Sequence, residues 1–113
     1  MTDTQRRLAV SEAVNYTDAD AFVSDMLLSS AFLPGDETEA APDLTQAEEL
    51  RRLWMVVAAP FRQLLGELGM TQSSCARRWC IPLRTVQGWA LGETRCPVYV
   101  RLMMAEICGV NKA

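Results

Sequence analysis

Four cysteines are the side chains in this chain with the clearest capacity for metal or redox chemistry. They stand at positions 75, 80, 96 and 108, without the Cys-x-x-Cys spacing that is typical of zinc sites. The 113 residues include no histidine, so a mixed cysteine–histidine site is excluded. A zinc site made of all four cysteines stays open beside the simpler interpretation of reduced, mostly buried thiols. We favour the thiols, and therefore expect no metal and no cofactor.

Side-chain combinations for catalysis are equally scarce. Without histidine, the chain has no histidine general base and no Cys–His pair, and it contains no glycine-rich phosphate loop. Acids are abundant in residues 1–50, but their spacing defines no catalytic pair. The sequence therefore predicts a protein that is not an enzyme.

Charge divides the chain into two contrasting halves, although the overall net charge is only −3. Residues 1–50 hold eleven acidic side chains against two arginines, a net charge of −9. Residues 51–113 hold nine basic side chains against three glutamates, a net charge of +6. This asymmetry suggests two surfaces with different partners, and the basic half suits the binding of nucleic-acid phosphates.

The elements predicted in the basic half would position such side chains. A short helix begins after Thr71, a good N-cap, and ends at Trp79. Residues 80–82 break it, and their proline stands where a second helix can accept one, at its first helical position. That helix covers residues 83–91 and ends at Gly92, which readily adopts a left-handed conformation. Two helices joined by so short a turn form a helix-turn-helix, whose second helix can enter the major groove of DNA.

The residues of this motif also carry a family resemblance. Its order and spacing are set by Thr71-Gln72, Cys75-Ala76, Cys80-Ile81, Thr85-Val86, Trp89 and Gly92. This pattern resembles the helix-turn-helix of the lambda repressor and Cro family, also called the Xre family, over residues 59–109. Two positions depart from it: Cys80 replaces the usual turn glycine and Pro82 the usual capping serine. A standard turn would give Cys80 a positive φ, which costs energy for a residue other than glycine.

The resemblance implies a set of residues that face the bases of DNA. They are Leu83, Arg84, Gln87 and Gly88. Arg84 suits the O6 and N7 atoms of guanine and Gln87 suits the N6 and N7 atoms of adenine, because both side chains can form paired hydrogen bonds. Leu83 could touch a thymine methyl group. The alternative for Arg84 is a solvated surface position, and Gly88 either permits close approach of DNA or is merely tolerated in the helix.

A second set would hold the DNA backbone. By the resemblance, Gln72 bonds a phosphate and braces the recognition helix, and Thr85 contacts a phosphate or helps to cap that helix. Arg77, Arg78 and Arg95 are candidate phosphate contacts by charge, with a solvated surface as the alternative. The resemblance assigns Cys75, Trp79, Val86 and Trp89 to the core.

Helices are also predicted outside the motif. Residues 1–15 show a weak helical pattern without a strong start signal. Thr17 and Asp20 resemble a capping box that opens a better helix. One face of this helix, at helical spacing, holds Ala19, Phe22, Val23, Met26, Leu27 and Ser30. This helix either covers the core of the basic half or presents an acidic surface to a protein partner. Residues 33–43 read as a linker rich in proline and acids.

Three further helices are predicted around the motif, one opened by a capping box and two by prolines. Thr45 and Glu48 form a capping box before a stripe of Leu50, Leu53, Trp54 and Val57. Pro60 then favours a fresh helix over residues 61–68 rather than a kink. The last helix begins at Pro97 and ends at Gly109. Its apolar face, made of Val98, Tyr99, Leu102, Met103, Ala105 and Ile107, is broad enough for a dimer contact, or else packs wholly inside its own bundle.

Together these features predict an all-α protein: a four- to five-helix lambda-repressor-like bundle over residues 45–113, preceded by an acidic helical region and linker over residues 1–44. The expected function is that of a sequence-specific DNA-binding transcriptional regulator, a repressor acting as a homodimer on a palindromic operator. The alternative is an antitoxin or mobile-element inhibitor, whose acidic region binds a protein partner while the motif regulates its own operon. No apolar run reaches transmembrane length and no signal segment opens the chain, so we expect a cytoplasmic protein without a membrane partner.

Overall fold

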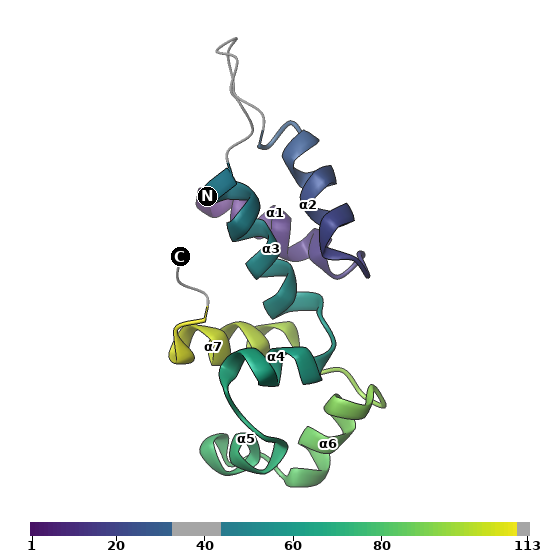
Figure 1. Ribbon diagram of the computed structural model, residues 1–113, viewed down its shortest axis with the longest axis vertical. Helices are drawn as coiled ribbons and strands as arrows, with labels where there is room; N and C mark the ends of the chain where they lie inside the picture. Colours follow the sequence, from purple (N-terminus) through teal and green to yellow (C-terminus); the bar gives the residue numbers. More distant parts are fainter. Residues whose placement is uncertain (33–43, 111–113) are drawn as a thin grey trace. The chain divides into compact units, whose positions relative to one another are not determined.

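The computed structural model describes residues 1–32 and 44–110, and in these ranges the ordered elements are helices, with no strand (Figure 1). The predicted all-α class is therefore confirmed. None of the helices described combines the length and the apolar character that a bilayer crossing requires. The chain divides into two compact units, Met1–Ala58 (unit 1) and residues 59–112 (unit 2). The linker predicted over residues 33–43 lies outside the described residues.

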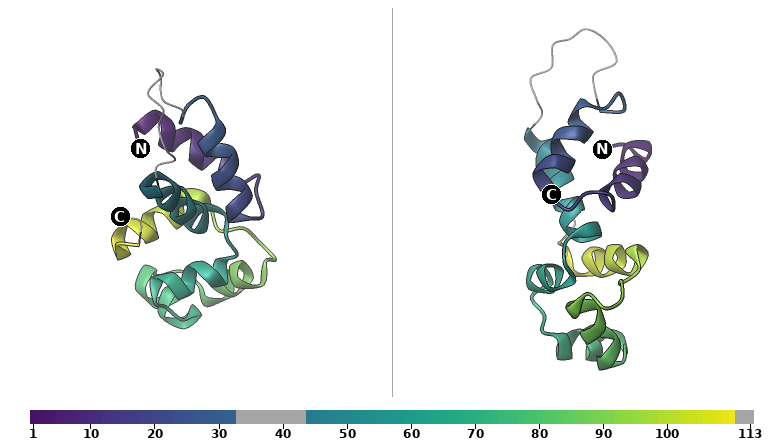
Figure 2. Two further views of the ribbon diagram at one scale, coloured as in Figure 1. Left: turned by 45° about the horizontal axis from the view of Figure 1, so that its top comes forward. Right: turned by 90° about the vertical axis from the view of Figure 1, so that its right-hand side faces the viewer.

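Unit 1 is built from three helices, α1 (Asp3–Ala13), α2 (Ala19–Leu28) and α3 (Leu44–Ala58). The α3 helix packs against both α1 and α2, which also contact each other (Figures 1 and 2). The largest fully buried side chains of unit 1 are Phe22, Leu50, Leu53 and Val56. The burial of these apolar side chains between the helices is the main source of stability for a unit of this kind.

The starts of α1 and α2 differ from the sequence predictions. In α1, Gln5 N donates to Thr2 Oγ1 (3.1 Å) and Thr2 N donates to Gln5 Oε1 (2.8 Å). This is a complete capping box, so α1 has the strong start signal, Thr-x-x-Gln, that the sequence analysis did not predict. In α2 the N-cap is Asp18 rather than Thr17, because the Asp18 carboxylate accepts hydrogen bonds from the backbone N–H groups of Asp20 and Ala21.

The α3 helix carries the apolar stripe predicted for it. Leu50, Leu53, Trp54 and Val57 are all buried. Trp54 Nε1 also donates to the carbonyl oxygen of Tyr16 (2.9 Å), which ties α3 to the loop between α1 and α2. The helix begins at Leu44, one residue before the predicted N-cap Thr45. Because its stripe packs within unit 1, α3 belongs to that unit, whereas the sequence placed residues 45–58 with the second domain.

Unit 2 contains four helices, α4 (Phe61–Leu68), α5 (Gln72–Trp79), α6 (Leu83–Leu91) and α7 (Val98–Cys108). The α6 helix packs against α4 and α5, and α7 packs against α4 (Figure 1). The predicted fresh helix after Pro60 is confirmed, since α3 ends at Ala58 and α4 starts at Phe61. Fully buried side chains come from each of the four helices: Leu64, Cys75, Val86, Met104 and Ala105.

One charged side chain and two thiols are buried in unit 2. Arg101 donates from Nη2 to the carbonyl oxygen of Ala59 (2.6 Å), and burial lowers the pKa of its guanidinium. Burial raises the pKa of the Cys96 thiol to about 12, and that of the Cys75 thiol also rises. Cys80 is exposed and Cys108 is half-buried. All four are free thiols, and the part of the chain that the structure describes holds no cluster of side chains suited to a metal ion.

Candidate nucleic-acid interface

The turn between α5 and α6 has the geometry that the sequence required. Cys80 adopts φ 55° and ψ 41°, and it is the one non-glycine residue with a positive φ in the described ranges. The N–H of Cys80 donates to the carbonyl oxygen of Arg77, and that of Ile81 donates to the carbonyl oxygen of Ala76 (3.0 Å). This pair of bonds is a Schellman motif, which normally uses glycine at the left-handed position. The positive φ predicted for Cys80 is confirmed.

Both helices of the motif start close to the predicted residues. The Thr71 hydroxyl accepts a hydrogen bond from Ser74 N (3.0 Å), and Thr71 N donates to Ser74 Oγ (2.9 Å). Ser74 thus takes the place of the usual Glu or Gln in a capping box. The sequence predicted Pro82 as the first helical residue of α6, but in the structure Pro82 is the N-cap of that helix. Its carbonyl oxygen accepts from the N–H groups of Thr85 (2.9 Å) and Val86 (3.3 Å).

The α6 helix has a clear inner side and outer side. On the inner side, Val86 is fully buried and Trp89 packs edge-on against Phe61 of α4, with ring centroids 5.3 Å apart and planes at 68°. On the outer side, three of the four residues predicted to face bases are exposed: Leu83, Arg84 and Gln87. Arg84 and Gln87 are three residues apart, so they are neighbours on the helix surface. The motif therefore presents one long cationic and one amide side chain together.

Gly88 does not have the exposed position that the sequence analysis assumed for it. It is buried, because the chain turns at Gly92 (φ 79°) and returns over α6. The N–H groups of Glu93 and Thr94 donate to the carbonyl oxygen of Gly88, at 2.9 and 3.4 Å. A Cβ atom at Gly88 would lie 3.2 Å from Thr94 Oγ1. The prediction that Gly88 faces the bases is therefore wrong, because the loop after α6 covers this residue.

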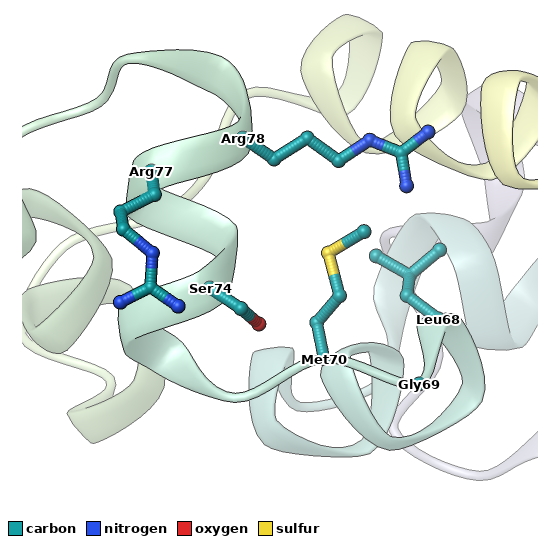
Figure 3. Close-up of a pocket in the computed structure, with 6 residues that line it drawn as sticks. All are labelled: Leu68, Gly69, Met70, Ser74, Arg77 and Arg78. Atoms are coloured by element: carbon teal, nitrogen blue, oxygen red, sulfur yellow. The ribbon is translucent and has the colours of Figure 1, made fainter.

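The predicted phosphate contacts lie partly beside a hollow of the surface. Arg77, Arg78 and Arg95 are exposed, and Gln72 and Thr85 are half-buried. An open pocket of about 480 Å³ lies between the end of α4 and α5 (Figure 3), lined by Leu68, Gly69, Met70, Ser74, Arg77 and Arg78. The two guanidinium groups extend in different directions from α5, and that of Arg78 reaches toward Leu68. Its Cζ atom also lies 5.1 Å from the centre of the Trp79 ring.

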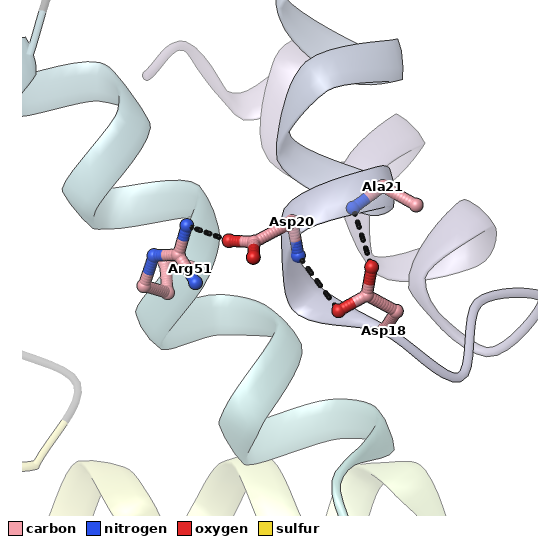
Figure 4. Close-up of polar contacts among 4 residues, drawn as sticks. All are labelled: Asp18, Asp20, Ala21 and Arg51. Carbon is pink, nitrogen blue, oxygen red and sulfur yellow. Dashed lines mark hydrogen bonds and ion pairs between the residues drawn. The ribbon is translucent and has the colours of Figure 1, made fainter.

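Several acids of unit 1 are occupied by contacts within that unit. Asp18 caps α2, and Asp20 forms an ion pair with Arg51 of α3 (Figure 4). Asp25 accepts a hydrogen bond from the Tyr16 hydroxyl (2.7 Å), which raises the pKa of Tyr16. Glu49 lies 3.6 Å from the N-terminal amino group. Asp20 and Glu49 thus link α3 to other parts of unit 1, whereas Asp18 and Asp25 act at α2 and the loop before it. The charge count alone did not indicate these contacts.

The α7 helix presents an apolar stripe to its surroundings. Tyr99, Met103 and Ile107 follow one another at intervals of four residues and are 66%, 54% and 60% exposed. Ala105 is fully buried, and Val98 and Leu102 are half-buried. The broad apolar face predicted for this helix is thus partly buried and partly exposed. The alternative in which the whole face packs inside its own bundle is wrong.

Comparison of the chain with protein-family models, with curated proteins and with solved structures found no match. Function is therefore inferred from the residues and geometry of the chain itself.

Proposed function

We propose that this protein is a sequence-specific DNA-binding transcriptional regulator of the lambda repressor and Cro (Xre) type. The observation that carries the proposal is the outer side of α6. Arg84 and Gln87 are exposed side by side there, while Val86 and Trp89 hold the opposite side of the helix against the unit. A helix anchored in this way can lie in the major groove, where Arg pairs with guanine and Gln with adenine.

The charge and side chains around α6 support contact with the DNA backbone. Residues 59–112 hold seven basic side chains against three glutamates. Exposed Arg77, Arg78 and Arg95 bind phosphates in this proposal, and Gln72 and Thr85 contribute polar groups near the starts of α5 and α6. Such contacts set the position of the protein on DNA but carry no sequence information themselves.

The exposed stripe of α7 supports a homodimer as the acting form. Tyr99, Met103 and Ile107 would be covered by the same stripe of a second copy. Dimerisation places two recognition helices on half-sites about 34 Å apart. This raises the affinity for a palindromic operator and fixes the position of the protein on it. A repressor in the cytoplasm is the corresponding cellular role.

An antitoxin or mobile-element inhibitor is the alternative function, with unit 1 as the binding module for a protein partner. The division of the chain into two compact units favours it. The internal bonds of Asp18, Asp20, Asp25 and Glu49 count against an acidic binding surface, because each carboxylate already has a partner within unit 1.

Salt dependence tests whether DNA is the ligand. The affinity of the full chain for duplex DNA should fall steeply as salt rises, because each arginine–phosphate contact releases condensed counterions. A plot of log K against log salt should have a slope of about −0.9 for each phosphate contacted. Fluorescence anisotropy with a labelled duplex measures this. A flat response between low and physiological salt would argue against DNA as the partner.

Substitution of the outer residues of α6 tests sequence recognition. Arg84→Ala or Gln87→Ala should cost about 1–3 kcal/mol at one base pair and relax the preference there. Arg77→Ala is the matched control, because loss of a phosphate contact should weaken all sequences alike. Selection from a random duplex library gives the preference of each variant. If Arg84→Ala kept the preferred operator unchanged, α6 would not read DNA with this face.

A further inference from the structure

The outer side of α6 has a position without a side chain. Gly88 follows Arg84 by four residues, so a side chain at Gly88 would stand directly beside Arg84 on the same face of the helix. The exposed outer positions carry an apolar side chain at Leu83 and long polar side chains at Arg84 and Gln87. A recognition face built from α6 alone would therefore have a gap next to Arg84.

The loop after α6 closes this gap. A Cβ atom at Gly88 would lie 3.2 Å from Thr94 Oγ1 and 3.9 Å from Glu93 Oε1. The Thr94 hydroxyl thus occupies the space that a side chain at Gly88 would take. Thr94 itself is an exposed residue, although Gly88 beneath it is buried.

The backbone keeps the loop in this place. Gly92 adopts φ 79° and turns the chain back, and the N–H groups of Glu93 and Thr94 both donate to the Gly88 carbonyl oxygen. The Thr94 side chain is therefore positioned by the end of the helix itself. A polar group held in this way is preorganised for recognition, in contrast to one on a freely moving loop.

We propose that Thr94 is a specificity-determining residue, which reads the base pair next to the one read by Arg84, and that Gly88 is the residue that positions it. This inference rests on the proposed DNA-binding function. A hydroxyl group both donates and accepts hydrogen bonds, and threonine also carries a methyl group that can touch thymine. The neighbouring Glu93 carboxylate can only accept, and it suits the N4 amino group of cytosine while repelling phosphates.

Library selection with the full-length chain tests the inference, using Thr94→Ala, Thr94→Val, Gly88→Ala and the Gly88→Ala/Thr94→Ala double variant. Thr94→Ala should lose about fivefold of discrimination at one base pair, the amount expected for a single hydrogen bond. That base pair should differ from those affected by Arg84→Ala and Gln87→Ala. Thr94→Val keeps the shape and removes the hydroxyl, so it separates hydrogen bonding from packing. Thr17→Ala, an exposed threonine of unit 1, is the matched control.

Gly88→Ala should affect the same base pair as Thr94→Ala, because the added methyl group displaces the Thr94 hydroxyl. The double variant should then match Thr94→Ala, since both changes act through one side chain. Circular dichroism checks that each variant is folded. If Gly88→Ala does not fold, the two Thr94 variants are sufficient for the test. Unchanged preferences in both Thr94 variants, with a specific wild-type protein, would overturn this inference alone. A wild-type chain that enriches no sequence would overturn the proposed function together with it.

Discussion

Replacing Phe61 by alanine is expected to destabilise unit 2 by about 3–5 kcal/mol and to abolish tight binding of DNA. Phe61 is only 4% exposed, and its ring packs edge-on against Trp89 of α6. It therefore fills the core and also holds α6 against α4. Small units have stabilities of only a few kcal/mol, so most of unit 2 should unfold. Urea unfolding and a DNA titration of the same variant measure the two effects.

Two further variants of α4 separate the contributions of Phe61. Phe61→Leu keeps most of the buried apolar volume and loses the edge-on ring contact, so a smaller destabilisation of about 0.5–1.5 kcal/mol is expected. Gln63→Ala changes an exposed residue of the same helix and should leave both stability and binding close to the wild type. Normal DNA affinity in Phe61→Ala would contradict the role given to α4 in holding α6.

Replacing Phe22 by alanine should destabilise unit 1 by a similar amount, about 3–5 kcal/mol, with little loss of DNA affinity. Phe22 is fully buried and packs edge-on against Tyr16, with ring centroids 5.5 Å apart. Because each unit is compact in its own right, the loss of the unit 1 core should leave the motif of unit 2 intact. Thermal unfolding followed by circular dichroism, together with DNA titration, checks both statements.

Leu28→Ala is the matched control for Phe22→Ala. Leu28 lies in the same helix but is 74% exposed, so its truncation should change the stability of unit 1 by no more than about 0.5 kcal/mol. Loss of DNA binding in Phe22→Ala, with unit 2 still helical, would show that unit 1 takes part in DNA binding. Unit 1 would then have to supply a dimer contact or a DNA contact of its own.

Local signals in the sequence were sufficient for the helix-turn-helix and its neighbours. Thr71 starts α5, Gly92 ends α6 and Pro60 separates α3 from α4, each as predicted. These outcomes depend on the conformational preferences of single residues and on hydrogen bonds that span a few positions. The positive φ of Cys80 followed from the same reasoning, because the turn requires a left-handed residue at that place.

Neighbouring candidates for one local role were harder to distinguish. Thr17 and Asp18 are both good N-caps, and only the backbone path before α2 determined that Asp18 accepts the hydrogen bonds. The capping box of Thr2 and Gln5 was present in the sequence, but the weak apolar pattern after it obscured the start of α1.

Contacts between distant residues decided the rest, because periodicity shows which side of a helix is apolar but not what covers it. Tertiary packing placed the stripe of α3 on α1 and α2, and left Tyr99, Met103 and Ile107 of α7 exposed. Tertiary packing also brought Asp20 of α2 next to Arg51 of α3. The sequence analysis had counted Asp20 only as part of the negative charge, but in the structure it forms an ion pair between two helices. At Gly88 the spacing along α6 indicated an outward position, and only the fold of the following loop brought Thr94 over it.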